Sequence, residues 1–393
     1  MNSVRRTKLL GIANGLLFVA LTGVLSANDT QLAIRTTPGL FNQRDTDTLG
    51  LPQLSCTLSI LYRASTSSFK FCHHANLAVF RDRLYACWSN GIDKEDHDGQ
   101  VVLYCFTEDG VNWSTPLVLA QDPDGALGDL GAVSAGFHTT SGTIVAYYTA
   151  IASDHKTFGR DRLFAISSTN GENWSKPKEL AAGFFIESPR RLRSGRLLMN
   201  GQFPNRQPRL RYSDTNDGVT GWRDATIPHS NVFDWPEPSW FERRDGTIVM
   251  LFRTKAGPTT GAVLYASISK DNGVSWSPPA PTNYPDATAR THAGNLPNST
   301  AYIINNPNHN PGGMRRIGQR RPLVIGLSSD GLLFDRAFVI RGENTSGRFG
   351  GKNKLDGWQY PASKVWKGHL FVAHSINKED FGVTRIPLEA VEP

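Results

Sequence analysis

The sequence predicts an all-β fold, a six-bladed β-propeller built from four-stranded antiparallel blades. A turn motif recurs five times, alternating apolar runs flank every copy, and no segment has the periodicity of a helix. The glycines of consecutive copies lie 61, 47, 55 and 58 residues apart, about the length of one blade. The copies occupy residues 107–113, 168–174, 213–222, 269–276 and 328–334.

Each motif combines a Ser or Thr, an Asp or Asn, a Gly and an aromatic residue. The first copy contains Asp109, Gly110 and Trp113. An Asp or Asn side chain accepts hydrogen bonds from backbone amides further along a turn, and Gly adopts the positive φ that such a turn needs. The aromatic ring fills the space beneath the loop. We therefore expect the motifs to form the outer hairpin turns of five blades.

A second set of turns lies between the motifs, with an apolar run on each side of every turn. Six inner hairpins together with five outer ones indicate six blades. The last blade has no motif after Lys378, so we expect a strand near residues 57–62 to complete it and close the ring. A seventh blade formed by residues 30–62 is the alternative. The inner turns lie at residues 82, 141–142, 194–195, 245–246, 297–298 and 367–368.

Residues 1–27 have the composition of a secretory signal peptide. Three basic residues precede an apolar stretch over residues 9–25, and the small residues Ser26 and Ala27 follow it. A membrane anchor is the alternative, although Gly and Asn residues interrupt the stretch. We expect a secreted or periplasmic protein that is free of the membrane once the signal is removed. Residues 28–70 then form an N-terminal segment with the ring-closing strand, and residues 71–393 form the propeller.

The charge balance argues against a nucleic-acid partner. The formal net charge is +7, and removal of the three basic residues of the signal leaves +4. The remaining basic residues are scattered along the chain rather than clustered. We expect a monomer that needs no cofactor. A structural calcium ion in the central channel remains an alternative.

All four cysteines lie in the first third of the chain, at positions 56, 72, 87 and 105. Export permits disulfides, and Cys87 and Cys105 fall on strands that we expect to be neighbours. The alternative is that the cysteines are small buried apolar residues. No Cys and His spacing indicates a zinc site.

In a propeller, the loops that enter each blade and those that follow its second strand open on one face, opposite the motif turns. Hydrogen-bonding and charged residues from at least five blades occupy these positions, and Trp88 offers a stacking surface. This convergence favours a polar, anionic sugar as ligand. The candidate binding residues at this mouth are Trp88, Asn90, Arg253, Arg290, Asn306, Arg320 and Arg321.

The five motifs resemble the Asp boxes of the sialidase superfamily, and the resemblance covers roughly residues 70–391. It implies a Tyr nucleophile activated by a Glu, arginines that hold the substrate carboxylate, and an Asp as acid/base. Glu237, followed by Arg253 sixteen residues later, resembles the family's Glu and second arginine. Tyr360, followed by Pro-Ala-Ser, resembles the nucleophile. A Tyr suits an acidic substrate, whose own carboxylate would repel an anionic nucleophile.

Two further roles follow from the same resemblance. The segment that ends at Arg320 and Arg321 is similar to the family's third-arginine strand, so either residue would take that role. The blade-one loop that contains Asp96 and Asp98 resembles the loop that carries the acid/base, and we assign this role to Asp98.

The chain departs from the family pattern at the entry of blade one. Where the family carries its first arginine, this chain has the pair His73 and His74. A neutral imidazole can remove a proton from C5 of a uronate while an arginine neutralises the carboxylate. In this respect the chain is similar to His-dependent propeller polysaccharide lyases. The alternative for the pair is a structural contact between blades.

Three functional hypotheses follow from these residues. The first is an exported enzyme that cleaves the glycosidic bond next to an acidic sugar of an oligo- or polysaccharide, with His73 or His74 in contact with the substrate. The second is a lyase in which one of these histidines is the base and Tyr360 donates the proton. The third is a glycan-binding propeller without catalytic activity.

Overall fold

The computed structural model gives one compact unit over Leu32–Pro393 and a separate unit over Met1–Gln31. The predicted signal segment, residues 1–27, lies outside the described residues. The described residues are 32–121, 129–152, 160–203, 205–254, 261–308, 320–351 and 353–392.

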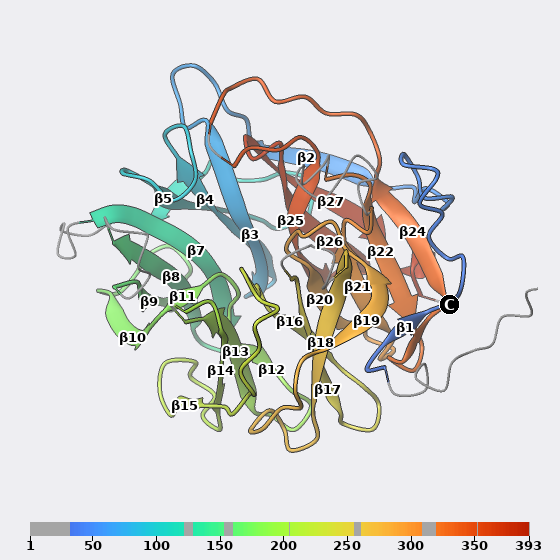
Figure 1. The fold of residues 1–393 in the computed structure, drawn as a ribbon. Coiled ribbons are helices and arrows are strands. Elements are labelled where there is room, and N and C mark those ends of the chain that lie inside the picture. The colour runs from blue at the N-terminus through green and yellow to red at the C-terminus, as the bar shows by residue number, and fades with distance from the viewer. Residues whose placement is uncertain are drawn as a thin grey trace, which may run out of the picture. The chain divides into compact units, whose positions relative to one another are not determined.

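The strands of the larger unit form six antiparallel blades (Figure 1). Blades one to five each use one continuous stretch of the chain, and blade six also takes an N-terminal strand. Blade one contains β3 (Phe71–Phe80), β4 (Arg83–Gly91), β5 (Val101–Thr107) and β6 (Leu117–Ala120). Blade two contains β7 (Asp129–Thr139), β8 (Ile144–Ala152), β9 (Arg162–Ser168) and β10 (Lys178–Ala182). Blade three contains β11 (Phe184–Phe185), β12 (Arg190–Arg191), β13 (Leu197–Gln202), β14 (Pro208–Ser213) and β15 (Arg223–Asp224).

The second half of the ring repeats the arrangement. Blade four contains β16 (Ser239–Glu242), β17 (Ile248–Phe252), β18 (Val263–Ser269) and β19 (Ala280–Pro285). Blade five contains β20 (His292–Asn295), β21 (Ala301–Asn305), β22 (Leu323–Ser328) and β24 (Arg336–Arg341). Blade six contains β25 (Trp358–Trp366), β26 (His369–Ile376), β27 (Asp380–Pro387) and β2 (Thr57–Tyr62).

An N-terminal strand closes the ring, as the sequence predicts. β2 pairs with β27 and supplies the outer strand of blade six. The seventh blade that was the alternative is wrong, because β1 (Arg35–Thr36) instead forms a short parallel pair with β23 (Leu333–Phe334). A 3₁₀ turn, η2 (Leu388–Ala390), follows the last strand. The predicted six-bladed all-β fold is confirmed.

The repeated motif forms the predicted turn. Asp109 Oδ1 accepts hydrogen bonds from the backbone amides of Val111 and Asn112, each at 2.8 Å. The turn requires glycine, since Gly110 has a φ of +76° and a Cβ there would lie 2.6 Å from the ring of Phe371. Asp330 in the fifth motif accepts hydrogen bonds from backbone amides in the same way.

Apolar side chains fill the spaces between neighbouring blades. One cluster joins Val102 and Tyr104 of blade one to Ala146 and Tyr148 of blade two. Burial of each large side chain of this kind contributes about 1.5–3 kcal/mol. These contacts hold the blades at fixed positions around the axis and so fix the ends of the innermost strands.

The cysteines are free thiols, so the disulfide alternative is wrong. Cys87 lies opposite Tyr104 while Cys105 lies opposite Ala86, one position away in register. Adjacent residues of a strand point to opposite faces of the sheet. Cys87 accordingly packs toward blade two, and Cys105 packs in the cluster shared with blade six.

Candidate active site

Tyr360, Glu237 and Arg253 meet where the innermost strands of blades four and six begin. The Tyr360 hydroxyl donates a hydrogen bond to Glu237 Oε1 at 3.2 Å. Nη1 of Arg253 donates to Glu237 Oε2 at 2.7 Å and to the Tyr360 oxygen at 2.9 Å. Tyr360 is only 4 % exposed. The three residues that the sequence groups by family resemblance therefore form one hydrogen-bonded triangle.

Backbone conformation is unusual at three residues of this site. His74, Glu237 and Tyr360 have φ values of +54°, +39° and +57°. Such a conformation costs about 1–3 kcal/mol for a non-glycine residue and persists only where the surrounding structure enforces it. The pairing of β25 with β26 shifts register between Gln359 and Ala362, which turns Tyr360 out of the regular strand. The ring of blades thus imposes strain that aims these side chains at one another.

Arginines from blades four and five surround the triangle. Although burial acts in the opposite direction, Glu237 and Tyr360 raise the pKa of Arg253 above its ordinary value. The guanidinium carbon of Arg320 lies 5.2 Å from the centre of the Tyr360 ring. Arg290 is 1 % exposed, and none of its three guanidinium nitrogens has a hydrogen-bond partner among the described residues. A buried guanidinium without a partner is costly, so this site is suited to an anion.

The two histidines lie against the tyrosine. The ring centre of His73 is 3.7 Å from that of Tyr360 and 4.1 Å from that of His74. Nδ1 of His74 is 3.2 Å from the hydroxyl of Ser89. Burial, and after it the charge of Lys378, lowers the pKa of His73 to about 3, so its imidazole is neutral near pH 7.

An ion pair that the sequence analysis did not single out lies beside His73 and Tyr360. Glu95 Oε1 lies 2.6 Å from the Lys378 ammonium and 3.0 Å from His73 Nε2. The Lys378 ammonium lies 5.0 Å from the centre of the Tyr360 ring. Lys378 and Glu95 stand in the loops that sequence reasoning places at this mouth. Their pairing could not be inferred, since 283 residues separate them.

A buried carboxyl group, Asp286, was also missed. It follows β19, and its Oδ1 accepts a 3.4 Å hydrogen bond from Asn305. Burial raises the pKa of Asp286 to about 7, against the opposing effect of Arg253. Only the position of Asp286 at the start of the crossover between blades four and five could have indicated it.

The structure buries two of the predicted binding residues within the protein. Trp88 is fully buried and stacks on Phe381 with ring centres 4.2 Å apart, so its prediction as a stacking surface is wrong. Asn90 is also buried; it accepts from Trp88 and donates to the carbonyl of Phe71. It acts as a structural link within blade one.

Three further predicted residues lie as follows. Asn306 is buried and donates to the carbonyls of Arg320, Pro322 and Trp358, so it holds the backbone near the site rather than a substrate. Arg321 turns away and pairs with Asp47, which leaves Arg320 as the arginine beside Tyr360. Asp98 is exposed on the loop between β4 and β5.

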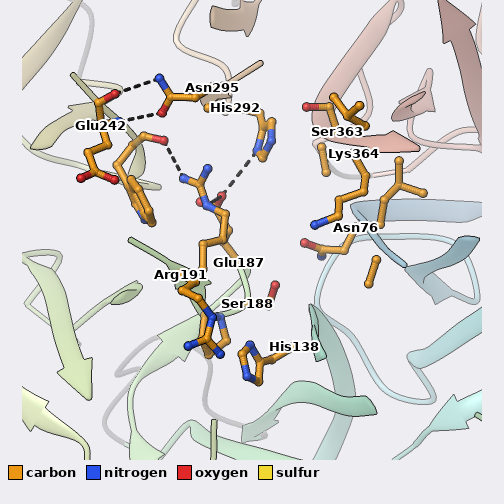
Figure 2. Close-up of a pocket in the computed structure, with 18 of the residues that line it drawn as sticks. Asn76, His138, Glu187, Ser188, Arg191, Glu242, His292, Asn295, Ser363 and Lys364 are labelled. Atoms are coloured by element: carbon orange, nitrogen blue, oxygen red, sulfur yellow. Dashed lines mark hydrogen bonds and ion pairs between the residues drawn. The ribbon is translucent and has the colours of Figure 1, made fainter. Parts of the chain in front are cut away.

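The opposite ends of the innermost strands border a separate cavity of about 670 Å³ (Figure 2). Arg190 lines it and donates hydrogen bonds to the carbonyls of Ala293 and Trp240. Glu187, which lines the cavity, lies 3.2 Å from Arg190 and 3.4 Å from His292. Lys364 projects into the open space in Figure 2.

Within the described ranges, no group of three or more His, Cys, Asp or Glu side chains is placed to hold a metal ion. No helix among these residues is long and apolar enough to cross a membrane.

Comparison with known structures gives sialidases as similar folds. A protein described as a sialidase is 20 % identical with a TM-score of 0.65, over 90 % of this chain and 35 % of its own. The chain therefore spans about a third of that protein. The Trypanosoma rangeli sialidase in complex with 2,3-difluorosialic acid is 12 % identical with a TM-score of 0.65, over 86 % of this chain and 60 % of its own.

A shorter protein of similar fold has nearly the same extent. The intramolecular trans-sialidase from Ruminococcus gnavus is 11 % identical with a TM-score of 0.58, over 86 % of this chain and 99 % of its own. Identities this low show the fold alone. No curated protein matches the chain.

The family model described as a BNR repeat-like domain matches residues 82–372, which contain all five turn motifs and every residue of the Tyr360 triangle. The chain belongs to the family of BNR repeat-like domain proteins.

Proposed function

We propose that this protein is an exported glycosidase of sialidase type that cleaves the bond next to an acidic sugar. The observation that carries the proposal is the triangle of Tyr360, Glu237 and Arg253, with hydrogen bonds of 2.7 to 3.2 Å. A hydroxyl bonded to a carboxylate is the arrangement of a nucleophile with its base. Export rests on the composition of residues 1–27.

The reaction begins when the acidic group of the sugar meets the cluster of Arg253, Arg290 and Arg320. Arg290, whose three guanidinium nitrogens have no hydrogen-bond partner within the described ranges, can donate to such an anion. Glu237 accepts the proton of Tyr360, and the phenol oxygen forms a bond to the anomeric carbon as the bond to the leaving oxygen breaks. We assign the proton donor for that oxygen to Asp98, on the blade-one loop. Water then releases the sugar, with Asp98 as base and the proton returned from Glu237 to Tyr360.

The contact between His73 and Tyr360 favours a second candidate, a lyase. The ring centre of the neutral His73 imidazole lies 3.7 Å from that of Tyr360. His73 could serve as base while Tyr360 protonates the leaving oxygen. Arg320 would neutralise the uronate carboxylate. A protein that binds glycans at this site but cleaves none of them would be a glycan-binding module.

One assay separates these functions. The protein is incubated with sialylated and with uronate-containing oligosaccharides, and the released sugars and the absorbance of an unsaturated uronate are followed. Free acidic sugar without that absorbance is the expected result. The absorbance would instead identify the lyase, and binding without any cleavage would identify the binding module. Loss of turnover in Tyr360→Phe, with retained binding, is expected for the glycosidase.

A further inference from the structure

The Lys378 side chain is the fourth cation around Tyr360 and comes from blade six. It lies in the three-residue turn between β26 and β27, is 2 % exposed, and has its ammonium 5.0 Å from the Tyr360 ring centre. Among the described residues its one hydrogen-bond partner is Glu95. An ammonium has three N–H donors, so two of them remain for a ligand.

The turn that carries Lys378 is held on all sides. The backbone carbonyl of Lys378 accepts a 2.8 Å hydrogen bond from the amide of Cys72 in blade one. Asn377 Oδ1 accepts from the hydroxyl of Thr345 and the amide of Gly357. Glu379 accepts from the amide of Phe349 at 2.7 Å. The backbone position of Lys378 is therefore as firmly fixed as that of a strand residue.

Lysine is an unexpected choice at this position. Its φ is +55°, and that of Asn377 is +57°, a conformation in which glycine or asparagine is preferred. A buried ion pair gives little net stability, because removing both charges from water offsets their attraction. Neither backbone preference nor the pairing with Glu95 explains why a lysine stands at position 378. A requirement for a positive charge beside Tyr360 does explain it.

Glu95 occupies the position that an anionic ligand would take. It stands on the loop between β4 and β5, with its side chain 15 % exposed. Its second oxygen accepts a hydrogen bond from Asn353. Burial acts to raise the pKa of Glu95, but Lys378 and then His73 hold it well below its usual range, so the group is a carboxylate. Glu95 therefore brings a negative charge to the Lys378 ammonium beside the Tyr360 ring.

We propose that Lys378 is a specificity-determining residue that binds the acidic group of the substrate, and that Glu95 neutralises it while the site is empty. This inference rests on the proposed function of the same site. The incoming carboxylate replaces Glu95 at the ammonium, and the exposed loop carries Glu95 aside. Arg320, whose guanidinium carbon lies 5.2 Å from the centre of the Tyr360 ring, completes the recognition of the anion.

The test measures binding, by calorimetry, of N-acetylneuraminic acid and glucuronic acid and of their neutral methyl esters. We expect Lys378→Met to weaken binding of the acids ten- to a hundredfold, the range for a lost charge-assisted hydrogen bond, and that of the esters less than twofold. Glu95→Gln should strengthen binding of the acids. Lys364→Met, in the separate cavity, is the matched control and should change the binding of neither the acids nor the esters. Lys378→Arg keeps the charge and should bind the acids more tightly than Lys378→Met.

Equal weakening for acids and esters, or no weakening in folded Lys378→Met, would overturn the proposal for Lys378 alone. A wild-type protein that binds the acids but cleaves no glycoside would refute the glycosidase function and leave the Lys378 comparison intact. A wild-type protein that binds neither acid would overturn both. If Lys378→Met unfolds, the Glu95→Gln result decides, because unchanged or weaker binding of the acids there contradicts the proposed role of Glu95 as placeholder.

Discussion

The buried amide of Asn306 gives a sharp test of how the site is held together. Its Nδ2 lies 3.0, 3.1 and 3.0 Å from the carbonyls of Arg320, Pro322 and Trp358, which belong to blades five and six. Leucine has the same branched shape but is larger and donates no hydrogen bond. Asn306→Leu therefore removes the donor, and its greater volume at this buried position can only add to the cost.

The cost can be worked from the partners. The carbonyl of Arg320 stays satisfied, since it also accepts from the amide of Trp358 at 2.9 Å. The carbonyls of Pro322 and Trp358 lose a donor in a buried environment, at about 1–3 kcal/mol each. We expect a loss of roughly 4 kcal/mol in the free energy of unfolding, the sum of two such terms at the middle of their range.

Equilibrium urea unfolding followed by tryptophan fluorescence measures this loss. With a slope of about 3 kcal/mol per molar urea, the midpoint should fall by roughly 1 M. Asn306→Asp should be worse, because it turns a carboxylate toward carbonyl oxygens. Asn173→Leu, on the surface, is the control and should stay within about 0.5 kcal/mol of the wild type. An Asn306→Leu protein that is as stable as this control would refute the reasoning.

Three other predictions concern a buried ion pair, a buried histidine and the four cysteines. In Glu237→Gln the buried Arg253 loses its anionic partner, so the free energy of unfolding measured in urea should fall by about 3 kcal/mol. Calorimetry should show tighter binding of acidic sugars to this variant. Unchanged stability would contradict the pairing of Glu237 with Arg253. The pKa of His73 is about 3 in the folded protein and lies below its unfolded value, so the stability that neutral His73 contributes is complete above pH 6.5 and is lost as pH falls toward 3. His73→Asn should reduce the slope of stability against pH by up to about 1.4 kcal/mol per pH unit in this range. An unaltered slope would show that His73 does not cause the pH dependence. All four cysteines should react with a thiol reagent after unfolding without reductant, and any loss of free thiols would contradict the structure.

The fold was predictable because the turn motifs need particular residues at particular places. Asp109 and Gly110 satisfy the amides and the positive φ of a turn, and these requirements can be read locally. The pairing of Thr57–Tyr62 with the last strand followed from counting hairpins. Tyr360, Glu237 and Arg253 were found through their spacing and the family resemblance.

The rest depended on contacts between distant segments. Trp88 stacks on Phe381, so its burial could not be read from its own strand. The choice between Arg320 and Arg321 followed from the strand's orientation against blade six. Glu95 lies beside Lys378 because of the loop conformation after β4, where Asp96 has a φ of +49°. No local sequence signal specifies that conformation.

The central claim is that Tyr360 is the nucleophile in the cleavage of a glycoside of an acidic sugar. The protein is incubated with 2,3-difluorosialic acid, and the modified residue is identified by peptide mass spectrometry. The account predicts one covalently attached sugar on the peptide that contains Tyr360, absent in Tyr360→Phe and slower to form in Glu237→Gln. A protein that hydrolyses sialosides while the label appears on another residue, or on none, would contradict it.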